Sequence, residues 1–364
     1  MEANLTILEE PIQEPGADCP DAQVDPADSP PSVGTTINNS GLYSFFDTPP
    51  SYDTVRVFLG GVIRLPIYEL HRVLARERTE CQNLSITTRI RNMRIYHRPK
   101  GLAIEGSLPI FLKKTNVLPL HLEDIKLAFE ELSDALHVDV SAGTVRRLDI
   151  GATFTVDHPV EEYFSLLAAL RRCDRKLYPK ATLYLQNKTK CLMFYDKVRQ
   201  ISSLSDGLVN IPENLRDPFS SSNVLRYEYQ CRKIENLFHS GLRASSLKDP
   251  GVYSSMALRW YKDYRAIIKD VTSFGDHTES YSLPIFKRDL IAVGAKKVGV
   301  TRVFEHLENL ARRRVITRTQ KSRFLREVKA SLGAGRNSAK RALLEELNRK
   351  LDRAYQSSCD QAVV

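Results

Sequence analysis

The sequence predicts an α+β protein, with an antiparallel or mixed sheet that carries helices on one face and a basic, all-helical C-terminal domain. Three observations support this prediction. Strand-like runs with two-residue alternation are interleaved with helical patterns up to about residue 240. From Ile285 onward the pattern is helical and rich in Lys and Arg. The Gly-rich loop typical of dinucleotide-binding and P-loop folds does not occur, which argues against those folds.

Composition divides the chain into three expected segments. Residues 1–47 hold nine acidic residues, no Lys or Arg, and few large apolar side chains. Such a segment cannot offset the entropy cost of folding, so we expect a disordered acidic leader. Residues 48–245 hold the interleaved strands and helices, and residues 246–364 form the expected basic helical domain.

The first expected strand is "YDTVRVFLGG", where Val55, Val57 and Leu59 alternate with other residues before a Gly-Gly stop. Helical spacing predicts a helix at "PIYELHRVLARER". Two more strands are expected at "RIRNMRIYHRP" and "GLAIEGSLPIFL", with a short helix or turn beginning near Pro109. A longer helix follows at "LEDIKLAFEELSDALHV", which carries an apolar stripe.

Further along, "TVRRLDIGATFTV" predicts a strand, and "PVEEYFSLLAALRRC" predicts a helix with Pro159 in its first turn. The stretches "ATLYLQNKT" and "KCLMFYDKV" predict a hairpin, and "NVLRYEYQCRKIENLF" a strand that gives way to a helix. In the C-terminal domain, interruptions are expected at Gly294 and Gly299. The last charged helix, "SAKRALLEELNRKLDRAYQ", is expected to be an oligomerisation or tail helix.

Charge points to a polyanionic partner. The net charge of +9 for the whole chain and −9 for its first fifty residues leave +18 for residues 51–364. Lys and Arg gain affinity for phosphate backbones by releasing counterions, so nucleic acid is the leading partner class. The alternative is a basic surface that only keeps the protein soluble. Scattered cysteines and the lack of a signal or membrane-length apolar run predict a reducing, cytoplasmic setting without a membrane partner.

Two acids stand inside apolar strands, where a buried charge is costly unless it is paired or binds a metal. These are Asp149 in "RRLDIGATF" and Glu228 in "LRYEYQ". If their strands are neighbours, side-chain alternation would bring both carboxylates to one Mg²⁺ or Mn²⁺. The alternative is that Asp149 pairs with Arg146 or Arg147, and Glu228 with Arg226.

Tyr195 in "CLMFYDK" is a candidate nucleophile, because a phenolate can attack a phosphodiester and form a covalent phosphotyrosine. Lys197 has the same strand parity, and it could lower the pKa of Tyr195 or balance negative charge during the attack. The alternative is an ordinary tyrosine at a strand edge with its hydroxyl in water. No Ser or Cys stands in a recognisable nucleophile motif, which argues against acyl transfer.

Read in order, several stretches resemble the gene II/X family, the replication initiators of filamentous phages and related plasmids. They are "YDTVRV", "IEGSLPIFLKKTN", "VRRLDIGATF", "ATLYLQNKTKCLMFYDK" and "LRYEYQCRKIENLF", within about residues 50–245. The resemblance implies a metal-dependent DNA endonuclease and strand transferase. Such an enzyme nicks one strand at a replicon origin, becomes joined to the 5′ phosphate through tyrosine, and leaves a 3′ hydroxyl that primes rolling-circle replication.

Carried over residue by residue, the resemblance implies that Tyr195 is the nucleophile and Lys197 its companion. It also implies that Asp149 and Glu228 bind Mg²⁺ or Mn²⁺. Glu105 is the candidate third ligand, with a local salt bridge as the alternative. The chain departs from the family within "PIFLKKTN", where members often carry a basic residue and a glycine.

The partners implied are origin DNA, in duplex and single-stranded form, and candidate host helicase and polymerase proteins in a bacterial cytoplasm. The expected DNA contacts are Arg146, Arg147, Arg226, Arg312, Arg313, Arg314 and Arg318. The C-terminal domain is expected to be a helix-turn-helix with a basic recognition surface, or a bundle whose basic residues are only its solvated face.

Two other functions fit the same sequence. One is a non-catalytic DNA-binding regulator of a phage or plasmid replicon, in which Tyr195 is ordinary packing. The other is a single-stranded nucleic-acid chaperone that stacks bases on Phe194, Tyr195, Tyr227 and Tyr229. Metal-dependent covalent capture of DNA would separate the enzyme from both.

Overall fold

The computed structural model describes residues 47–61, 80–82, 85–178, 182–204, 210–271, 282–333 and 338–361. These residues belong to one compact unit, Leu42–Val364. The expected acidic leader, apart from Asp47, and the helix expected at residues 66–78 lie outside the described residues.

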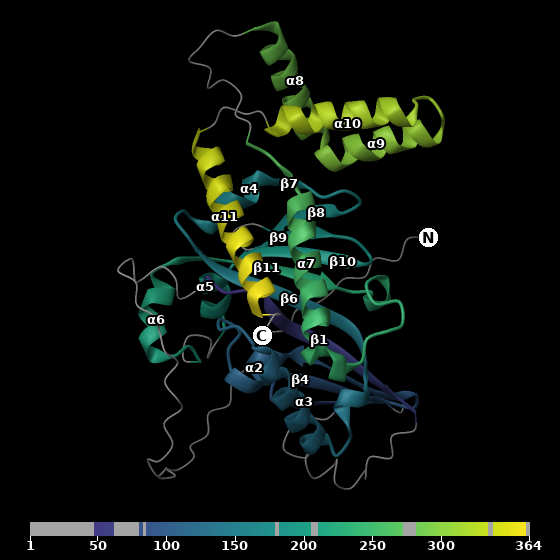
Figure 1. Ribbon diagram of the computed structural model, residues 1–364, viewed down its shortest axis with the longest axis vertical. Coiled ribbons are helices and arrows are strands. Elements are labelled where there is room, and N and C mark those ends of the chain that lie inside the picture. Colours follow the sequence, from purple (N-terminus) through teal and green to yellow (C-terminus); the bar gives the residue numbers. More distant parts are fainter. Residues whose placement is uncertain are drawn as a thin grey trace. The chain divides into compact units, whose positions relative to one another are not determined.

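The described chain is built around a ten-stranded sheet (Figure 1). Its strand order is β2-β3-β4-β5-β1-β6-β11-β10-β9-β8, and every neighbouring pair is antiparallel. The bounds are β1 Ser51–Gly60, β2 Glu80–Gln82, β3 Ser85–Ile90, β4 Met93–Arg98, β5 Gly101–Ser107, β6 Thr144–Val156, β8 Asp174–Tyr178, β9 Thr182–Gln186, β10 Lys190–Asp196 and β11 Asn223–Cys231. The prediction of an α+β protein with an antiparallel sheet is confirmed.

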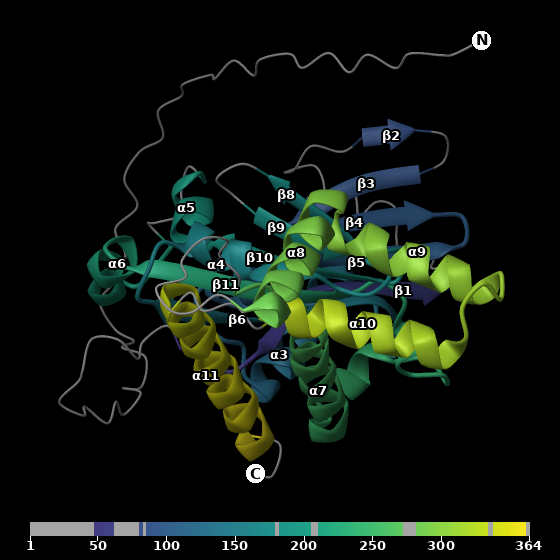
Figure 2. The same cartoon turned by 90° about the horizontal axis from the view of Figure 1, so that it is seen from above.

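Three helices cover one face of this sheet: α3 (Leu122–Leu136), α7 (Pro250–Ala266) and α11 (Ser338–Gln361), as Figure 2 shows. Alternate residues of β6, β10 and β11 point toward them and form the main hydrophobic core. Tyr227 stacks between Phe194, with ring centres 4.4 Å apart, and Trp260, at 5.0 Å. The other residues of the same strands therefore form a second, polar face of the sheet.

Shorter elements connect the strands. They are α2 Leu108–Lys113, α4 Val160–Leu166, α5 Lys197–Ser202 and α6 Glu213–Ser220, with a two-stranded sheet of β7 Leu167–Ala169 and β12 Ile268–Lys269. The helix expected to continue from Pro159 to Cys173 ends at Leu166, because Leu167–Ala169 pairs with β12 instead. Strand β8 was not predicted, and after β11 the expected helix is only a 3₁₀ turn, Ile234–Asn236.

The helices within residues 246–364, the predicted C-terminal domain, divide between two apolar clusters. Helices α8 (Leu283–Val298), α9 (Val300–Arg312) and α10 (Arg318–Gly333) form a separate apolar cluster around Ala292, Phe304 and Leu332. The break at Gly299 is confirmed, whereas Gly294 lies inside α8. Helices α7 and α11 instead join the main core through Trp260, Leu347 and their neighbours.

Helix α11 is not the free tail helix that its charge suggested. Leu343, Leu347, Leu351 and Ala354 recur every three or four residues and are all buried in the main core. This narrow apolar stripe is hidden in sequence among many charged residues. None of the helices in the described part of the chain has the length and apolar character of a membrane span.

Candidate functional site

Two register shifts between β1 and β6 shape the polar face. Tyr52 pairs with Ile150 and Val55 with Leu148, so β1 has one extra residue in the segment that holds Asp53. Arg56 pairs with Arg147 and Val57 with Val145, so the extra residue in β6 is Arg146. A bulge of this kind redirects side chains relative to regular alternation.

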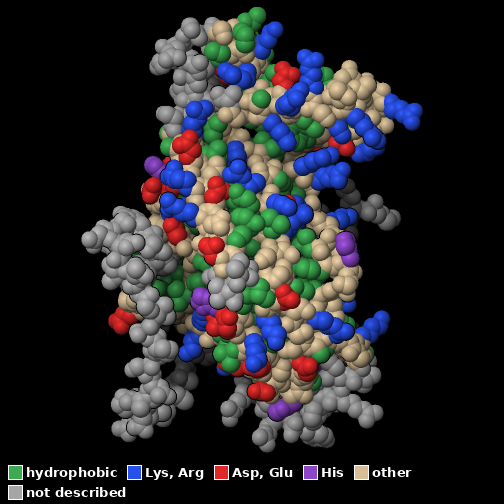
Figure 3. All heavy atoms as spheres, viewed as in Figure 1, with side chains coloured by type: hydrophobic (Ala, Val, Ile, Leu, Met, Phe, Trp, Pro, Cys, Tyr) green, Lys and Arg blue, Asp and Glu red, His purple; other side chains and the backbone are tan. Residues whose placement is uncertain are grey.

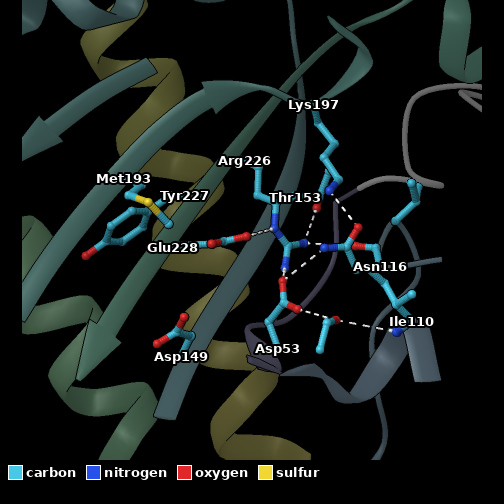
Figure 4. A network of polar contacts seen from close by, with 12 residues as sticks. Asp53, Ile110, Asn116, Asp149, Thr153, Met193, Lys197, Arg226, Tyr227 and Glu228 are labelled. Carbon is cyan, nitrogen blue, oxygen red and sulfur yellow. Dashed lines mark hydrogen bonds and ion pairs between the residues drawn. The ribbon is translucent and has the colours of Figure 1, made fainter. Parts of the chain in front are cut away.

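Arg226 of β11 lies at the centre of a buried polar network, made of Asp53, Asn116, Tyr195, Lys197, Arg226 and Glu228. Figure 4 labels all of these residues except Tyr195. Arg226 donates from its Nη2 to Asp53 Oδ2 and from its Nε to Glu228 Oε1, each at 2.5 Å. Its Nη1 donates to the carbonyl oxygen of Asn116 at 3.1 Å and to the Thr153 hydroxyl at 3.0 Å. Two buried carboxylates thus depend on one guanidinium.

Asp53 is a member of the network that sequence reasoning missed. Besides Arg226, it accepts hydrogen bonds from Ser107 Oγ at 2.5 Å and Asn116 Nδ2 at 3.1 Å. Burial alone would raise the pKa of Asp53, but Arg226 and Ser107 hold it below the usual value. The signal was present in "YDTVRV", because an acid that opens an apolar strand needs a partner just as Asp149 does.

Tyr195 is not a wet tyrosine at a sheet edge. Its strand β10 lies between β11 and β9, the residue is 9% exposed, and it stands opposite Arg226. The Tyr195 hydroxyl donates to Glu228 Oε1 over 2.6 Å. Burial and the nearby Glu228 charge raise the pKa of Tyr195 well above its usual value, against an opposing effect of Arg226. The pKa of Tyr195 is therefore raised overall, rather than lowered as a neighbouring Lys197 suggested.

Lys197 is the first residue of α5 rather than part of the strand. It is fully buried, and its ammonium donates to Asn116 Oδ1 at 2.7 Å and Gln200 Oε1 at 2.8 Å. The same nitrogen lies 5.6 Å from the ring centre of Tyr195. Burial and the neighbouring Arg226 lower the pKa of Lys197 to about 7. Lys197 can therefore gain or lose a proton near neutral pH.

Asp149 and Glu228 do lie on neighbouring strands and on the same face, as predicted: Glu228 stands opposite Gly151, and Gln230 opposite Asp149. Their oxygens, however, already have cationic partners. Asp149 accepts from Arg147 Nε at 3.0 Å and Nη2 at 2.5 Å, while Glu228 accepts from Arg226. The ion-pair alternative is confirmed for both acids.

For Glu105, too, the alternative to metal binding is confirmed, because it forms local salt bridges. It pairs with Arg147 at 3.0 Å and with Arg56 at 2.8 Å. Across the described ranges, no group of three or more His, Cys, Asp or Glu side chains is placed to hold a metal ion. As arranged, the three carboxylates do not fit Mg²⁺ or Mn²⁺, and the requirement for either ion stays a prediction.

The remaining predicted DNA contacts have different surroundings. Arg147 and Arg226 are engaged by carboxylates, whereas Arg146 is exposed. Lys and Arg side chains gather over α9 and α10 in Figure 3. The exposed residues there that were predicted to bind DNA are Arg312, at the end of α9, Arg313 and Arg314 in the following turn, and Arg318 at the start of α10. Their contact with DNA stays a prediction.

The prediction that four aromatic rings form a stacking platform, as a nucleic-acid chaperone would need, is wrong. Phe194, Tyr227 and Tyr229 are buried on the helix-covered face, while Tyr195 lies on the opposite face. These four rings therefore cannot form one surface for stacked bases.

Neither a protein-family model nor a curated protein sequence matches this chain.

The buried position of Asp149 leads to a prediction about pH. Burial raises the pKa of Asp149 to about 7. The charges of Glu228 and Asp53 also raise this pKa, whereas Arg147 lowers it. Between about pH 4 and pH 7 the native protein then holds a proton that the unfolded chain has released, so the free energy of unfolding falls as pH rises.

We expect Asp149→Asn to remove about 2 kcal/mol of this fall between about pH 5 and pH 7.5. Urea unfolding of the natural protein and the variant at both pH values measures the difference. Lys197 titrates in both proteins, so its contribution to the change in unfolding free energy cancels when the two proteins are compared. If both lose the same stability over this interval, Asp149 does not carry the proton.

Proposed function

We propose that this protein nicks one DNA strand at a replicon origin through a covalent 5′-phosphotyrosine on Tyr195, and so primes rolling-circle replication. The observation that supports this proposal is the 2.6 Å hydrogen bond from the Tyr195 hydroxyl to Glu228, beside the guanidinium of Arg226. A nucleophile held by a base, which is itself oriented by a third group, is the usual arrangement for covalent catalysis.

In the proposed reaction, Tyr195 Oη attacks the phosphorus and its proton passes to Glu228. The bond from phosphorus to the 3′ oxygen breaks, and that oxygen takes up the proton that Glu228 received, which gives the priming 3′ hydroxyl and restores the Glu228 carboxylate. Because the pKa of Tyr195 is raised, the phenol keeps its proton until the attack, and Glu228 acts as the general base. The reverse reaction, attack by a 3′ hydroxyl, restores Tyr195 and reseals the strand.

Positive charge near the phenol would stabilise the additional negative charge of the transition state. Arg226 lies opposite Tyr195 on the neighbouring strand, and the Lys197 ammonium is 5.6 Å from the phenol ring centre. The charge of +9 for the whole chain further favours a polyanionic substrate.

The second candidate function is a non-catalytic DNA-binding regulator. The observation that favours it is that Asp53, Asp149 and Glu228 are all paired with arginines, as a purely structural network would be. In that case Tyr195 only completes the packing of the network.

Covalent capture of DNA tests the proposal. The protein is incubated with labelled single-stranded origin DNA and Mn²⁺, Mg²⁺ or EDTA, and the products are separated on a denaturing gel. We expect an adduct that survives denaturation, with the DNA linked to the tryptic peptide Cys191–Lys197. Adduct formation in EDTA would remove the metal requirement. DNA that is bound but never captured would favour the regulator.

A further inference from the structure

A second feature of the polar face lies away from Tyr195. It is a surface cleft of about 440 Å³, which we call the arginine–aromatic cleft. Its floor includes Gly101 and Ala103 of β5. Its other lining residues are Arg56 and Phe58 of β1, Tyr96 and Arg98 of β4, and Arg146 of β6.

Strand register explains why these side chains meet. Tyr96 stands opposite Ala103, Ala103 opposite Phe58, and Arg98 opposite Gly101. The small residues of β5 leave room between the two aromatic rings. Arg146, the extra residue of β6, lies with its guanidinium 5.8 Å from the ring centre of Phe58. The cleft is therefore built from four strands and a bulge.

The charge of this region favours an anion. Arg98 and Arg146 are exposed, and Arg56 has a side chain 47% exposed although it pairs with Glu105. Exposed Arg94 and Arg89 stand opposite each other on the neighbouring strands β4 and β3. Arginines that surround partly exposed aromatic rings suit a chain of phosphates that carries flat, unpaired bases.

We propose that the arginine–aromatic cleft binds single-stranded DNA, with a base stacked on Tyr96 or Phe58 and the arginines on the adjoining phosphates. The choice of DNA rests on the proposed nicking function. Duplex DNA does not suit the cleft, because its base faces are already stacked on each other.

The cleft is separate from the nucleophile. Tyr195 stands opposite Arg226, Arg226 opposite Thr153, and Arg146 lies seven residues along β6 from Thr153. Ordinary strand spacing and rise place Arg146 about 25 Å from Tyr195. The cleft would thus hold a segment several nucleotides away from the attacked phosphate and set the direction of the strand on the sheet.

Fluorescence anisotropy with a labelled oligo(dT) in low salt tests this proposal without any cleavage. We expect Tyr96→Ala to lower the affinity about tenfold, as for the loss of one stacked base, and Tyr96→Phe to keep it. Arg146→Ala is also expected to weaken binding. The matched control is Arg265→Ala on α7, whose guanidinium lies 6.0 Å from the Tyr261 ring on the helix-covered side.

Equal losses for Arg146→Ala and Arg265→Ala would overturn the proposal, because binding would then depend only on net charge. Unchanged affinity in Tyr96→Ala, or tighter binding of duplex DNA or of oligo(U) than of oligo(dT), would also overturn it. Weaker binding by the cleft variants, with no covalent adduct on the natural protein, would keep the cleft and reject the nicking function. If the natural protein forms the adduct and the cleft variants bind oligo(dT) as tightly as the natural protein does, the nicking function is kept and the cleft proposal is rejected.

Discussion

Changing Tyr195 to phenylalanine is expected to abolish the covalent protein–DNA adduct and to leave the fold intact. The substitution removes the only atom of this side chain that can attack phosphorus, while the ring keeps its packing on β10. Glu228 loses the 2.6 Å hydrogen bond from the phenol but keeps Arg226 at 2.5 Å, so no carboxylate is left unpaired. The expected loss of stability is about 1 kcal/mol, as for one hydrogen bond.

The denaturing gel, combined with urea unfolding, measures both effects. Tyr184→Phe is the matched control, because Tyr184 lies on the next strand, opposite Met193, and faces the same side of the sheet. We expect the control to form as much adduct as the natural protein. An adduct that persists in Tyr195→Phe would move the nucleophile to another residue, and equal losses in both variants would indicate damage to the polar face in general.

The strands that carry the site were predictable, because each shows a local alternation of apolar and other residues. Alternation in "RRLDIGATF" and "LRYEYQ" predicted that Asp149 and Glu228 would share a face if their strands were neighbours, and the structure does pair these strands. It could not decide between a metal site and ion pairs, since Arg147 and Arg226 follow the same alternation as the acids. That choice depends on side-chain geometry, which sequence periodicity does not contain.

Other features depended on irregularities. The bulges in β1 and β6 add one residue to each strand, and such insertions are invisible to a period-two pattern. As a result, alternation alone could not show that Asp53 faces Arg226, although an acid in "YDTVRV" was visible in the sequence, and the position of Arg146 beside Phe58 was not foreseen. Lys197 was placed on the strand because the helix that begins there is only six residues long. The contacts of α11 with the main core depend on how the chain returns to the sheet, and no local sequence pattern predicts that path.

The buried network should respond strongly to the loss of its only guanidinium. Arg226→Met is expected to lower the free energy of unfolding by about 3–5 kcal/mol, because Asp53 and Glu228 remain as buried charges without their main partner. Arg226 and Asp53 each have a side chain only 4% exposed, so water cannot replace the ion pair. Arg265→Met, which breaks an exposed pair with Asp352 at 3.7 Å, is the matched control, with an expected cost below about 1 kcal/mol.

A triple variant separates charge from packing. If orphaned charge causes the loss, Arg226→Met combined with Asp53→Asn and Glu228→Gln should regain much of the stability, because neutral amides cost less to bury than unpaired carboxylates. If the loss comes from poor packing of methionine, the triple variant should be no more stable than Arg226→Met. A small effect of Arg226→Met itself would mean that Ser107, Asn116 and Tyr195 already satisfy the carboxylates. Another cation could then replace Arg226 in the network. A metal-bound state of this face would in that case be a better proposal than the arginine ion pairs.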